Sequence, residues 1–324
     1  MRQITYAEAL NEAMREELRK DPHLFIIGED IGFRGGAFKV TKDLYLEFPD
    51  RIIDTPIAEN AIAGAAYGAA ITGVKAIAEF MYADFSLYGL DQIVNSAAKC
   101  RFMYGAQTTV PVVFRLPGGG GRQNAAQHSQ SLEAVFANIP GLKIIMPATP
   151  EDAKGLLKSA INDNNPIVFI EHKALYFTKG YVPEYEYYTP IGKGMVRREG
   201  KDVTVVATQY NMLKSLEAAE ILAKEGIDVE VIDPRTIVPL DEEIILESVR
   251  KTGRLVVSHE APETYGVGGE ICAMVTEKAF DYLNAPPIRA CGKYLPIPYN
   301  RELEKHVIPQ VEDIVASIRQ IMSY

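Results

Sequence analysis

The sequence predicts an α/β protein built on mostly parallel sheets, and two observations indicate this class. Short, nearly continuous apolar runs of strand length recur along the chain, and stretches with helical periodicity separate many of them. Such strands are buried on both faces, as happens when helices cover both sides of a parallel sheet. The chain has 324 residues, of which 47% are hydrophobic, which is the length of about two domains.

The first predicted domain covers residues 1–180. It opens with an amphipathic helix at residues 5–18, where Thr5 and Glu8 have the spacing of a capping box. Apolar runs then predict strands at residues 24–29, 51–54, 74–80, 110–116, 143–147 and 166–172.

A polar, tyrosine-rich stretch at residues 180–189, GYVPEYEYYT, has the periodicity of neither a helix nor a strand. We therefore place a linker at residues 181–200. Beyond it, residues 201–324 form a second predicted α/β domain. Its strands are predicted at 203–208, 229–233 and 254–260, and its helices near 212–225 and 241–250.

Composition and charge narrow the class of protein. A net charge of −9 and a pI near 5.2 argue against a nucleic acid partner, because phosphate backbones are bound by clustered Lys and Arg. No apolar run approaches the roughly 18 residues of a membrane span, and no signal or transit pattern opens the sequence, so we expect a cytoplasmic protein. The three cysteines and five histidines show no spacing typical of a disulfide framework or a transition-metal site.

Residues 54–73 run from a strand into a helix of Ala, Gly and other small residues, which another backbone can approach closely. Glu59 begins this helix. A carboxylate there is either stabilised by the helix dipole and solvent or presented to a ligand in a dry cleft. Met81, Tyr82 and Phe85 follow at the next strand-to-helix junction. Such side chains pack either in the core or on the ring of a ligand.

Residues 115–134 contain a run of four glycines and lead to His128, with a helix predicted to start near Ser129. His128 is either structural or an acid, base or hydrogen-bond donor in catalysis. The glycine run has no phosphate-loop or dinucleotide signature, and GVGGE at 266–270 lacks the third glycine of that fingerprint. A single-chain nicotinamide dehydrogenase is therefore disfavoured.

Longer blocks span nearly the whole chain: GED at 28–30, RIIDTPIAE at 51–59, GAAYGAA at 64–70, DQIVNSAAK at 91–99, AAQHSQS at 125–131, PGLKIIMP at 140–147, DAKGLLKSAINDNNP at 152–166 and IDPRTIVPLD at 232–241. In this order they resemble the β subunits of thiamine-diphosphate-dependent 2-oxo acid dehydrogenases. That family includes pyruvate, branched-chain 2-oxo acid and acetoin dehydrogenases. The resemblance implies a transketolase-like pyrimidine-binding domain with a mostly parallel sheet, followed by a transketolase C-terminal α/β domain.

The resemblance also implies an enzyme that is active only with an α subunit, in an α2β2 heterotetramer. Its reaction would decarboxylate pyruvate or a branched-chain 2-oxo acid on thiamine diphosphate and acylate the lipoyl group of an acyltransferase. An acetoin dehydrogenase subunit, or a mainly structural subunit that anchors the acyltransferase core, remains an alternative. The chain lacks the GDG motif with which such enzymes hold magnesium and diphosphate, so the α subunit is expected to hold both.

The resemblance further implies roles for single residues. Glu59 would hydrogen-bond N1′ of the cofactor's aminopyrimidine, and Phe85 would stack on that ring, with Ile57 and Met81 completing the pocket. Some relatives have Gln in place of Met81, so no polar contact is carried over there.

Two further catalytic residues are implied. His128 would face the substrate, and Glu29 would belong to a proton path between subunits. A structural potassium ion would be bound by oxygens of Val112, Ala160, Ile161, Asp163 and Asn165.

Overall fold

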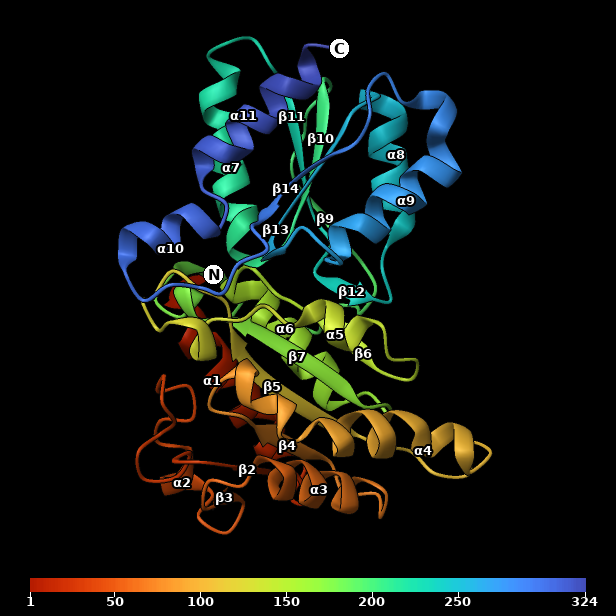
Figure 1. Cartoon of the computed structure of the whole chain (residues 1–324). Helices are drawn as coiled ribbons and strands as arrows, with labels where there is room; N and C mark the ends of the chain where they lie inside the picture. Colours follow the sequence, from red (N-terminus) through yellow and green to blue (C-terminus); the bar gives the residue numbers. More distant parts are fainter. The chain divides into compact units, whose positions relative to one another are not determined.

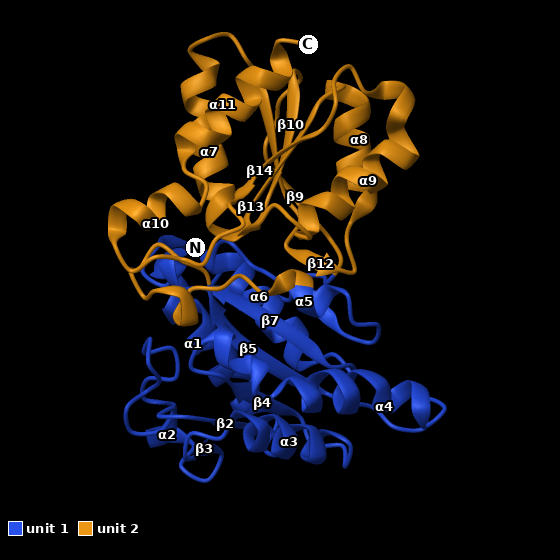
Figure 2. Cartoon of the chain, in the orientation of Figure 1, with its two compact units in different colours: residues 1–118, 135–191 blue, residues 119–134, 192–324 orange.

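The computed structural model describes residues 1–324 and divides them into two compact units (Figures 1 and 2). Unit 1 comprises residues 1–118 and 135–191, and unit 2 comprises residues 119–134 and 192–324. Residues 119–134, which lie inside the predicted first domain, thus cluster with unit 2. Residues 181–191 cluster with unit 1.

Unit 1 is built on a parallel sheet in which its strands lie in the order β6-β7-β5-β4-β2-β3. Ile26 of β2, for example, is paired with Ile52 of β3 and Ile77 of β4, and all three side chains are buried. The predicted parallel sheet is confirmed. Its strands are β2 (Phe25–Gly28), β3 (Ile52–Asp54), β4 (Ala76–Glu79), β5 (Val112–Gly118), β6 (Lys143–Ile145) and β7 (Ile167–His172).

The first helix, α1 (Tyr6–Lys20), begins as the sequence predicts. The side chain of Thr5 accepts a hydrogen bond from the backbone N–H of Glu8, and the Glu8 carboxylate accepts one from the backbone N–H of Thr5 at 2.7 Å. The predicted capping box is confirmed, and two N–H groups of the helix end are satisfied. The other helices of this part of the chain are α2 (Leu44–Glu47), α3 (Glu59–Ala70), η1 (Ala83–Leu87), η2 (Gln92–Ala97), α4 (Ala98–Met103), α5 (Glu133–Ala137), α6 (Pro150–Ile161) and η4 (Lys173–Leu175).

A small antiparallel ribbon joins the beginning and the end of unit 1. Strand β1 (Arg2–Thr5) pairs with β8 (Lys179–Val182). The prediction that residues 180–189 are neither helix nor strand is therefore wrong for residues 180–182. These residues have no apolar pattern of their own, and backbone pairing with a distant segment makes them a strand.

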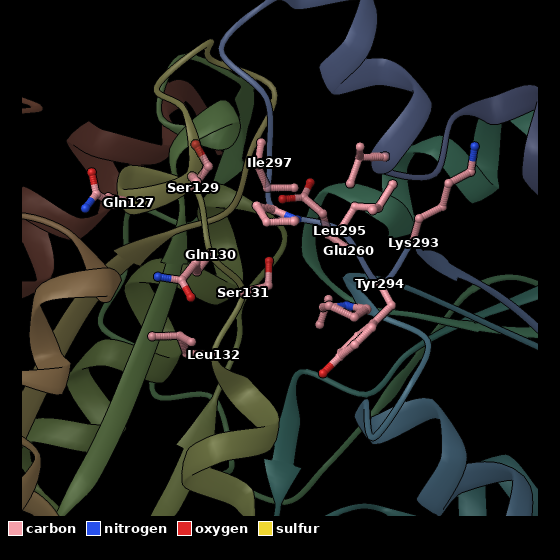
Figure 3. Close-up of a pocket in the computed structure, with 15 residues that line it drawn as sticks. Gln127, Ser129, Gln130, Ser131, Leu132, Glu260, Lys293, Tyr294, Leu295 and Ile297 are labelled. Carbon is pink, nitrogen blue, oxygen red and sulfur yellow. The ribbon is translucent and has the colours of Figure 1, made fainter.

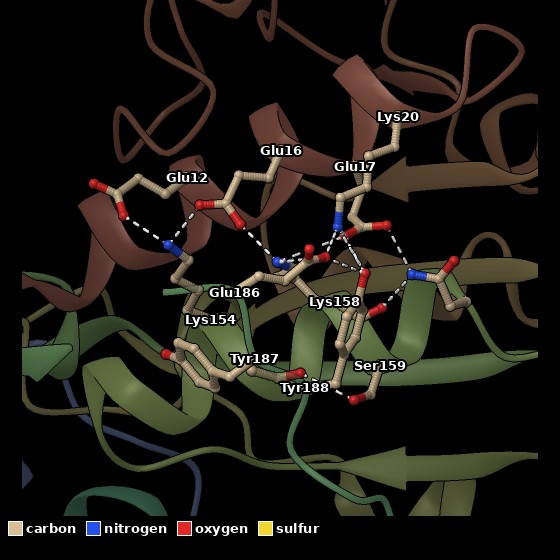
Figure 4. A network of polar contacts seen from close by, with 12 residues as sticks. Glu12, Glu16, Glu17, Lys20, Lys154, Lys158, Ser159, Glu186, Tyr187 and Tyr188 are labelled. Carbon is tan, nitrogen blue, oxygen red and sulfur yellow. Dashed lines mark hydrogen bonds and ion pairs between the residues drawn. The ribbon is translucent and has the colours of Figure 1, made fainter. Parts of the chain in front are cut away.

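Residues 184–189 are attached to helices α1 and α6 by charged and polar side chains (Figure 4). The hydroxyl of Tyr188 donates to Glu17 of α1 at 3.1 Å. Lys158 of α6 is fully buried, pairs with Glu16 at 2.6 Å, and lies with its Nζ 4.8 Å from the centre of the Tyr188 ring. The last residues of unit 1 are thus packed onto its helices.

Unit 2 has a five-stranded sheet in the order β14-β13-β10-β11-β9, in which β9 is the antiparallel edge strand. Helices α7 and α11 cover one face and α8 and α9 the other (Figure 1). The predicted second α/β domain has this architecture. Its elements are β9 (Met195–Arg198), β10 (Val203–Ala207), α7 (Gln209–Ala223), β11 (Val229–Asp233), β12 (Thr236–Val238), α8 (Glu242–Thr252), β13 (Leu255–Pro262), α9 (Val267–Ala279), η5 (Phe280–Tyr282), β14 (Ile288–Gly292), α10 (Arg301–Val307) and α11 (Val311–Met322).

The glycine run is held within unit 2 by two carboxylates. The backbone N–H of Gly120 donates to Glu260, and Glu304 accepts from the N–H of Gly121 at 2.8 Å and from that of Gln123 at 3.1 Å. Gly121 has a φ of +80°, a conformation that favours glycine. These hydrogen bonds fix the conformation of the loop. We call residues 119–134 the glycine strap.

No helix of the chain combines the length and the apolar character needed to cross a membrane.

Candidate active site

Five of the predicted site residues of unit 1 gather at one edge of its sheet. Glu29 follows the end of β2, Ile57 and Glu59 follow β3, and Met81 and Phe85 follow β4. These three strands are parallel neighbours in the order β4-β2-β3. Their carboxyl ends therefore meet at the same edge, which is where open α/β sheets bind ligands.

The structure places Glu59 at the first residue of α3, as predicted, and buries it to 8% exposure. The backbone at Gly89 lies close to the backbone at Glu59, where this helix starts. A Cβ at Gly89 would lie 3.1 Å from the backbone oxygen of Glu59 and 3.0 Å from the ring of Phe80. Glycine at position 89 thus lets the chain after β4 run directly beside the beginning of α3.

Glu29 and Glu59 form a pair of buried carboxyls. Glu29 is 5% exposed. Burial raises the pKa of Glu29, the charge of Glu59 raises it further, and a hydrogen bond from the backbone of Ala58 opposes both effects. Oxygen Oε1 of Glu29 is buried without a hydrogen-bond partner. Because burial and a nearby like charge disfavour its ionised form, Glu29 retains a proton more readily than an isolated carboxylate does.

Apolar side chains follow the same strand ends as the acid pair. Ile57 is 80% exposed, so that most of its apolar side chain faces water. Met81 and Phe85 are half-buried. The Phe85 ring is held edge-on by Tyr82, with ring centres 5.6 Å apart and an interplanar angle of 78°. This end of the sheet therefore combines two buried carboxyls with apolar and aromatic side chains.

His128 belongs to unit 2, where it ends a short 3-10 helix, η3 (Ala126–His128). The prediction that a helix starts near Ser129 is wrong, because the next helix begins at Glu133. His128 stands in the glycine strap between Gln127 and Ser129, and both of these neighbours line a cavity of unit 2.

That cavity has a volume of about 630 Å³, within the usual range for small-molecule sites. Figure 3 shows the glycine strap on one side and the chain around Tyr294 and Leu295 on the other. The lining residues are Ala126, Gln127, Ser129, Gln130, Ser131, Leu132, Glu260, Ala261, Pro262, Lys293, Tyr294, Leu295, Pro296, Ile297 and Val307.

The predicted potassium ligands lie at the opposite edge of the unit 1 sheet, around the amino ends of β5 and β7: Val112, Ala160, Ile161, Asp163 and Asn165. The side-chain oxygens there are already engaged by cations. Lys143 pairs with Asp163, and Arg101 donates to Oδ1 of Asn165 at 2.7 Å. Backbone carbonyls, rather than these side chains, therefore suit a metal ion in this turn.

Sequence reasoning missed a buried ion cluster beside the site. Arg115 of β5 pairs with Glu79 at the end of β4 and with Glu171 of β7. Arg115 and Glu171 are fully buried. Their signal was present, because each charge interrupts an apolar run that was predicted to be a buried strand, and buried charges require partners.

Both units match known domain families. Residues 2–179 match the family described as transketolase, pyrimidine binding domain, and residues 192–314 match transketolase, C-terminal domain. The chain is 46% identical to the pyruvate dehydrogenase E1 component subunit beta of Rickettsia conorii over 323 residues, 99% of each chain. It is 44% identical to the 2-oxoisovalerate dehydrogenase subunit beta of Bacillus subtilis over 324 residues, again 99% of each.

The chain belongs to the family of 2-oxo acid dehydrogenase β subunits. This family depends on thiamine diphosphate, and its β subunits work with an α subunit. A solved structure described as a split gene transketolase, inactive beta4 tetramer, shares the fold. Its TM-score is 0.82 over 99% of this chain and 98% of that chain, at 24% identity.

The carboxyl edge of the β-subunit sheet fits the aminopyrimidine of that cofactor. Oε1 of Glu29 and Oγ1 of Thr55 are buried without hydrogen-bond partners, and buried polar atoms of this kind require a partner from elsewhere. Ile57 offers uncovered apolar surface beside them. A flat ring with polar nitrogens could hydrogen-bond the unpartnered oxygens and cover the apolar surface of Ile57.

Proposed function

We propose that this chain is the β half of a pyruvate or branched-chain 2-oxo acid dehydrogenase, which decarboxylates the 2-oxo acid and acylates a lipoyl group. The observation that carries the proposal is the gathering of Glu29, Ile57, Glu59, Met81 and Phe85 at the carboxyl ends of three neighbouring strands. The relatives named above carry pyruvate or 2-oxoisovalerate in their names. This favours those substrates over acetoin, and an enzyme over a purely structural subunit.

Glu59 would hold and release a proton at N1′ of the aminopyrimidine. Its burial at the first turn of α3 suits this role, because a carboxylate in a dry site exchanges protons directly with a bound group. Phe85 would stack on the ring, and Ile57 and Met81 would enclose it. When bound, thiamine diphosphate supplies the electron sink for the decarboxylation.

Glu29 would share a proton with Glu59. The raised pKa of Glu29 supports this, since it keeps a proton available beside the catalytic acid. His128 would orient the 2-oxo group or assist acyl transfer from its place on the glycine strap.

The partners follow from what the chain lacks. The sequence contains no GDG motif, so we propose that the α subunit holds magnesium and the diphosphate, in an α2β2 assembly that serves a lipoyl-bearing acyltransferase. The exposed Ile57 belongs, in this proposal, to the surface that the assembly covers.

Calorimetry of thiamine diphosphate with magnesium tests the split site. We expect binding to the chain co-expressed with its α subunit and none to the chain alone. Glu59→Gln in the co-expressed pair should lower turnover of the 2-oxo acid about 100-fold or more, as loss of a general acid–base group does. The matched control is Glu220→Gln, which removes an exposed carboxylate of α7 and should leave turnover unchanged. Full activity of Glu59→Gln would contradict the proposal.

A potassium ion at the opposite edge of the sheet is the second part of the proposal. Its ligands would be oxygens of Val112, Ala160, Ile161, Asp163 and Asn165. The melting temperature should rise with KCl and not with choline chloride at equal ionic strength. Equal melting curves in the two salts would remove potassium from the proposal.

A further inference from the structure

The segment that carries Met81 and Phe85 begins at Glu79, the last residue of β4, and Glu79 is bound to the buried ion cluster. Arg115, the register partner of Glu79 on β5, donates to it through Nη1. Arg115 also donates to Glu171 of β7 through Nε at 2.6 Å and Nη2 at 2.9 Å. Buried, charge-assisted and forked bonds of this kind are strong and directional.

The other side of the cluster continues into a row of aromatic rings. The hydroxyl of Tyr176 donates to Glu171 at 2.6 Å, and the Tyr176 ring stacks on Phe38 with centres 5.0 Å apart and an interplanar angle of 25°. Phe38 meets Tyr82 edge-on at 5.6 Å. Tyr82 in turn meets Phe85 edge-on at 5.6 Å.

These contacts connect both ends of the segment 79–85 to the same residue, Arg115. The segment's first residue is bound to Arg115 directly, and its last is connected to the same Arg115 through the aromatic row and Glu171. Lys173 reinforces the row, with its Nζ 5.5 Å from the centre of the Tyr82 ring.

Phe38 also connects two loops of the candidate site. It lies in the excursion between β2 and β3, which begins at Glu29. That excursion packs on the ion cluster, because a Cβ at Gly36 would lie 3.0 Å from Oε1 of Glu79. The loop that begins at Glu29 and the loop that carries Phe85 are therefore held in place by the same set of contacts.

We infer that Phe38 and Tyr176 are positioning residues for the cofactor ring, which they serve by fixing the ring of Phe85 relative to the Arg115 cluster. The inference rests on the proposed function, in which Phe85 stacks on the aminopyrimidine. Phe38 and Tyr176 act through Tyr82 and Phe85.

The test uses Phe38→Leu in the full chain, co-expressed with its α subunit. Two quantities are measured: the dissociation constant of thiamine diphosphate by calorimetry, and the hydrogen–deuterium exchange of residues 80–88 without cofactor. We expect the dissociation constant to rise about tenfold, the scale of losing one or two aromatic pairs, and the exchange of residues 80–88 to become faster. Phe38→Tyr keeps the ring and should restore both.

Phe114→Leu is the matched control. Phe114 is fully buried and next to Arg115, but successive side chains of a strand point to opposite faces of the sheet. Its truncation should lower the melting temperature without changing cofactor affinity or the exchange of residues 80–88. Tyr176→Phe, which removes only the hydroxyl, should accelerate that exchange less than Phe38→Leu does.

Unchanged exchange in Phe38→Leu, or equal acceleration in Phe114→Leu, would overturn the inference. A wild-type complex that does not bind thiamine diphosphate would instead overturn the proposed function, and the exchange of residues 80–88 would still decide whether Phe38 holds Phe85.

Discussion

The carboxyl of Glu29 lies close enough to that of Glu59 for the two charges to repel, and both groups are buried. The pair is therefore costly to the fold when both carboxyls are ionised. In the proposed function this cost is retained because the pair binds the polar ring of the cofactor.

Glu29→Gln should stabilise the chain, and more so at high pH. The folded pKa of Glu29 lies above its ordinary value of 4.5, so the folded state binds the extra proton and wild-type stability falls as pH rises from 4.5 through the folded pKa. Gln removes this loss. Urea unfolding of the isolated chain at pH 5 and pH 8 measures the effect, with the exposed Asp50→Asn as control. A gain that is the same at both pH values would contradict the prediction.

Glu133→Gln should show the same sign in unit 2. Burial, and then the charge of Glu260, raise the pKa of Glu133 to about 7. The wild type therefore loses stability as the pH rises from 4.5 through the folded pKa of about 7, whereas the variant does not. The difference should level off above about pH 8, at on the order of 3 kcal/mol. Unfolding curves at half-unit steps of pH would show this plateau. A difference independent of pH would refute it.

Arg115→Met should destabilise the chain severely, by about 3–5 kcal/mol, because it leaves two buried carboxyls without their cation. Arg250→Met is the control. Arg250 pairs with Glu243 on the surface, and surface pairs contribute about 0–1 kcal/mol. The free energy of unfolding in urea gives both values. Similar losses for the two variants would mean that burial of Arg115 does not matter.

Gly155→Ala should loosen residues 184–189 from α6. A Cβ at Gly155 would lie 2.1 Å from Oγ1 of Thr189 and 2.7 Å from the ring of Tyr187, and overpacking costs about 1–3 kcal/mol. Gly68→Ala is a matched change in helix α3, where a Cβ meets nothing within 4 Å. It should stabilise the isolated chain by about 0.5–1 kcal/mol. Melting curves of both variants should therefore shift in opposite directions.

The two α/β sheets were predictable because each buried parallel strand appears in the sequence as a local apolar run. The positions of the glycine strap and of β8 could not be predicted in this way. Glu304, which binds Gly121 and Gln123, lies far along the chain from them, and no local pattern encodes such a partner. β8 exists only because β1 pairs with it.

For the site, residues alone left Glu59, Phe85 and His128 open between structural and functional roles, and the family resemblance supplied the roles. The structure adds the common sheet edge. Arg115 was readable as a buried charge in an apolar run, but its partners Glu79 and Glu171 come from other strands and required the register.

The glycine strap leaves unit 1 after β5, is bound by Glu260 and Glu304, and returns at Val135. The segments of the two units consequently alternate along the sequence, so that cleavage of the chain at a single position cannot separate the units. A fragment ending at residue 191 would contain strands β2 to β7 of unit 1. It would carry His128 on a strap from which the carboxylates of Glu260 and Glu304 had been removed. Domain dissection of this protein therefore requires a deletion within the strap as well as a truncation.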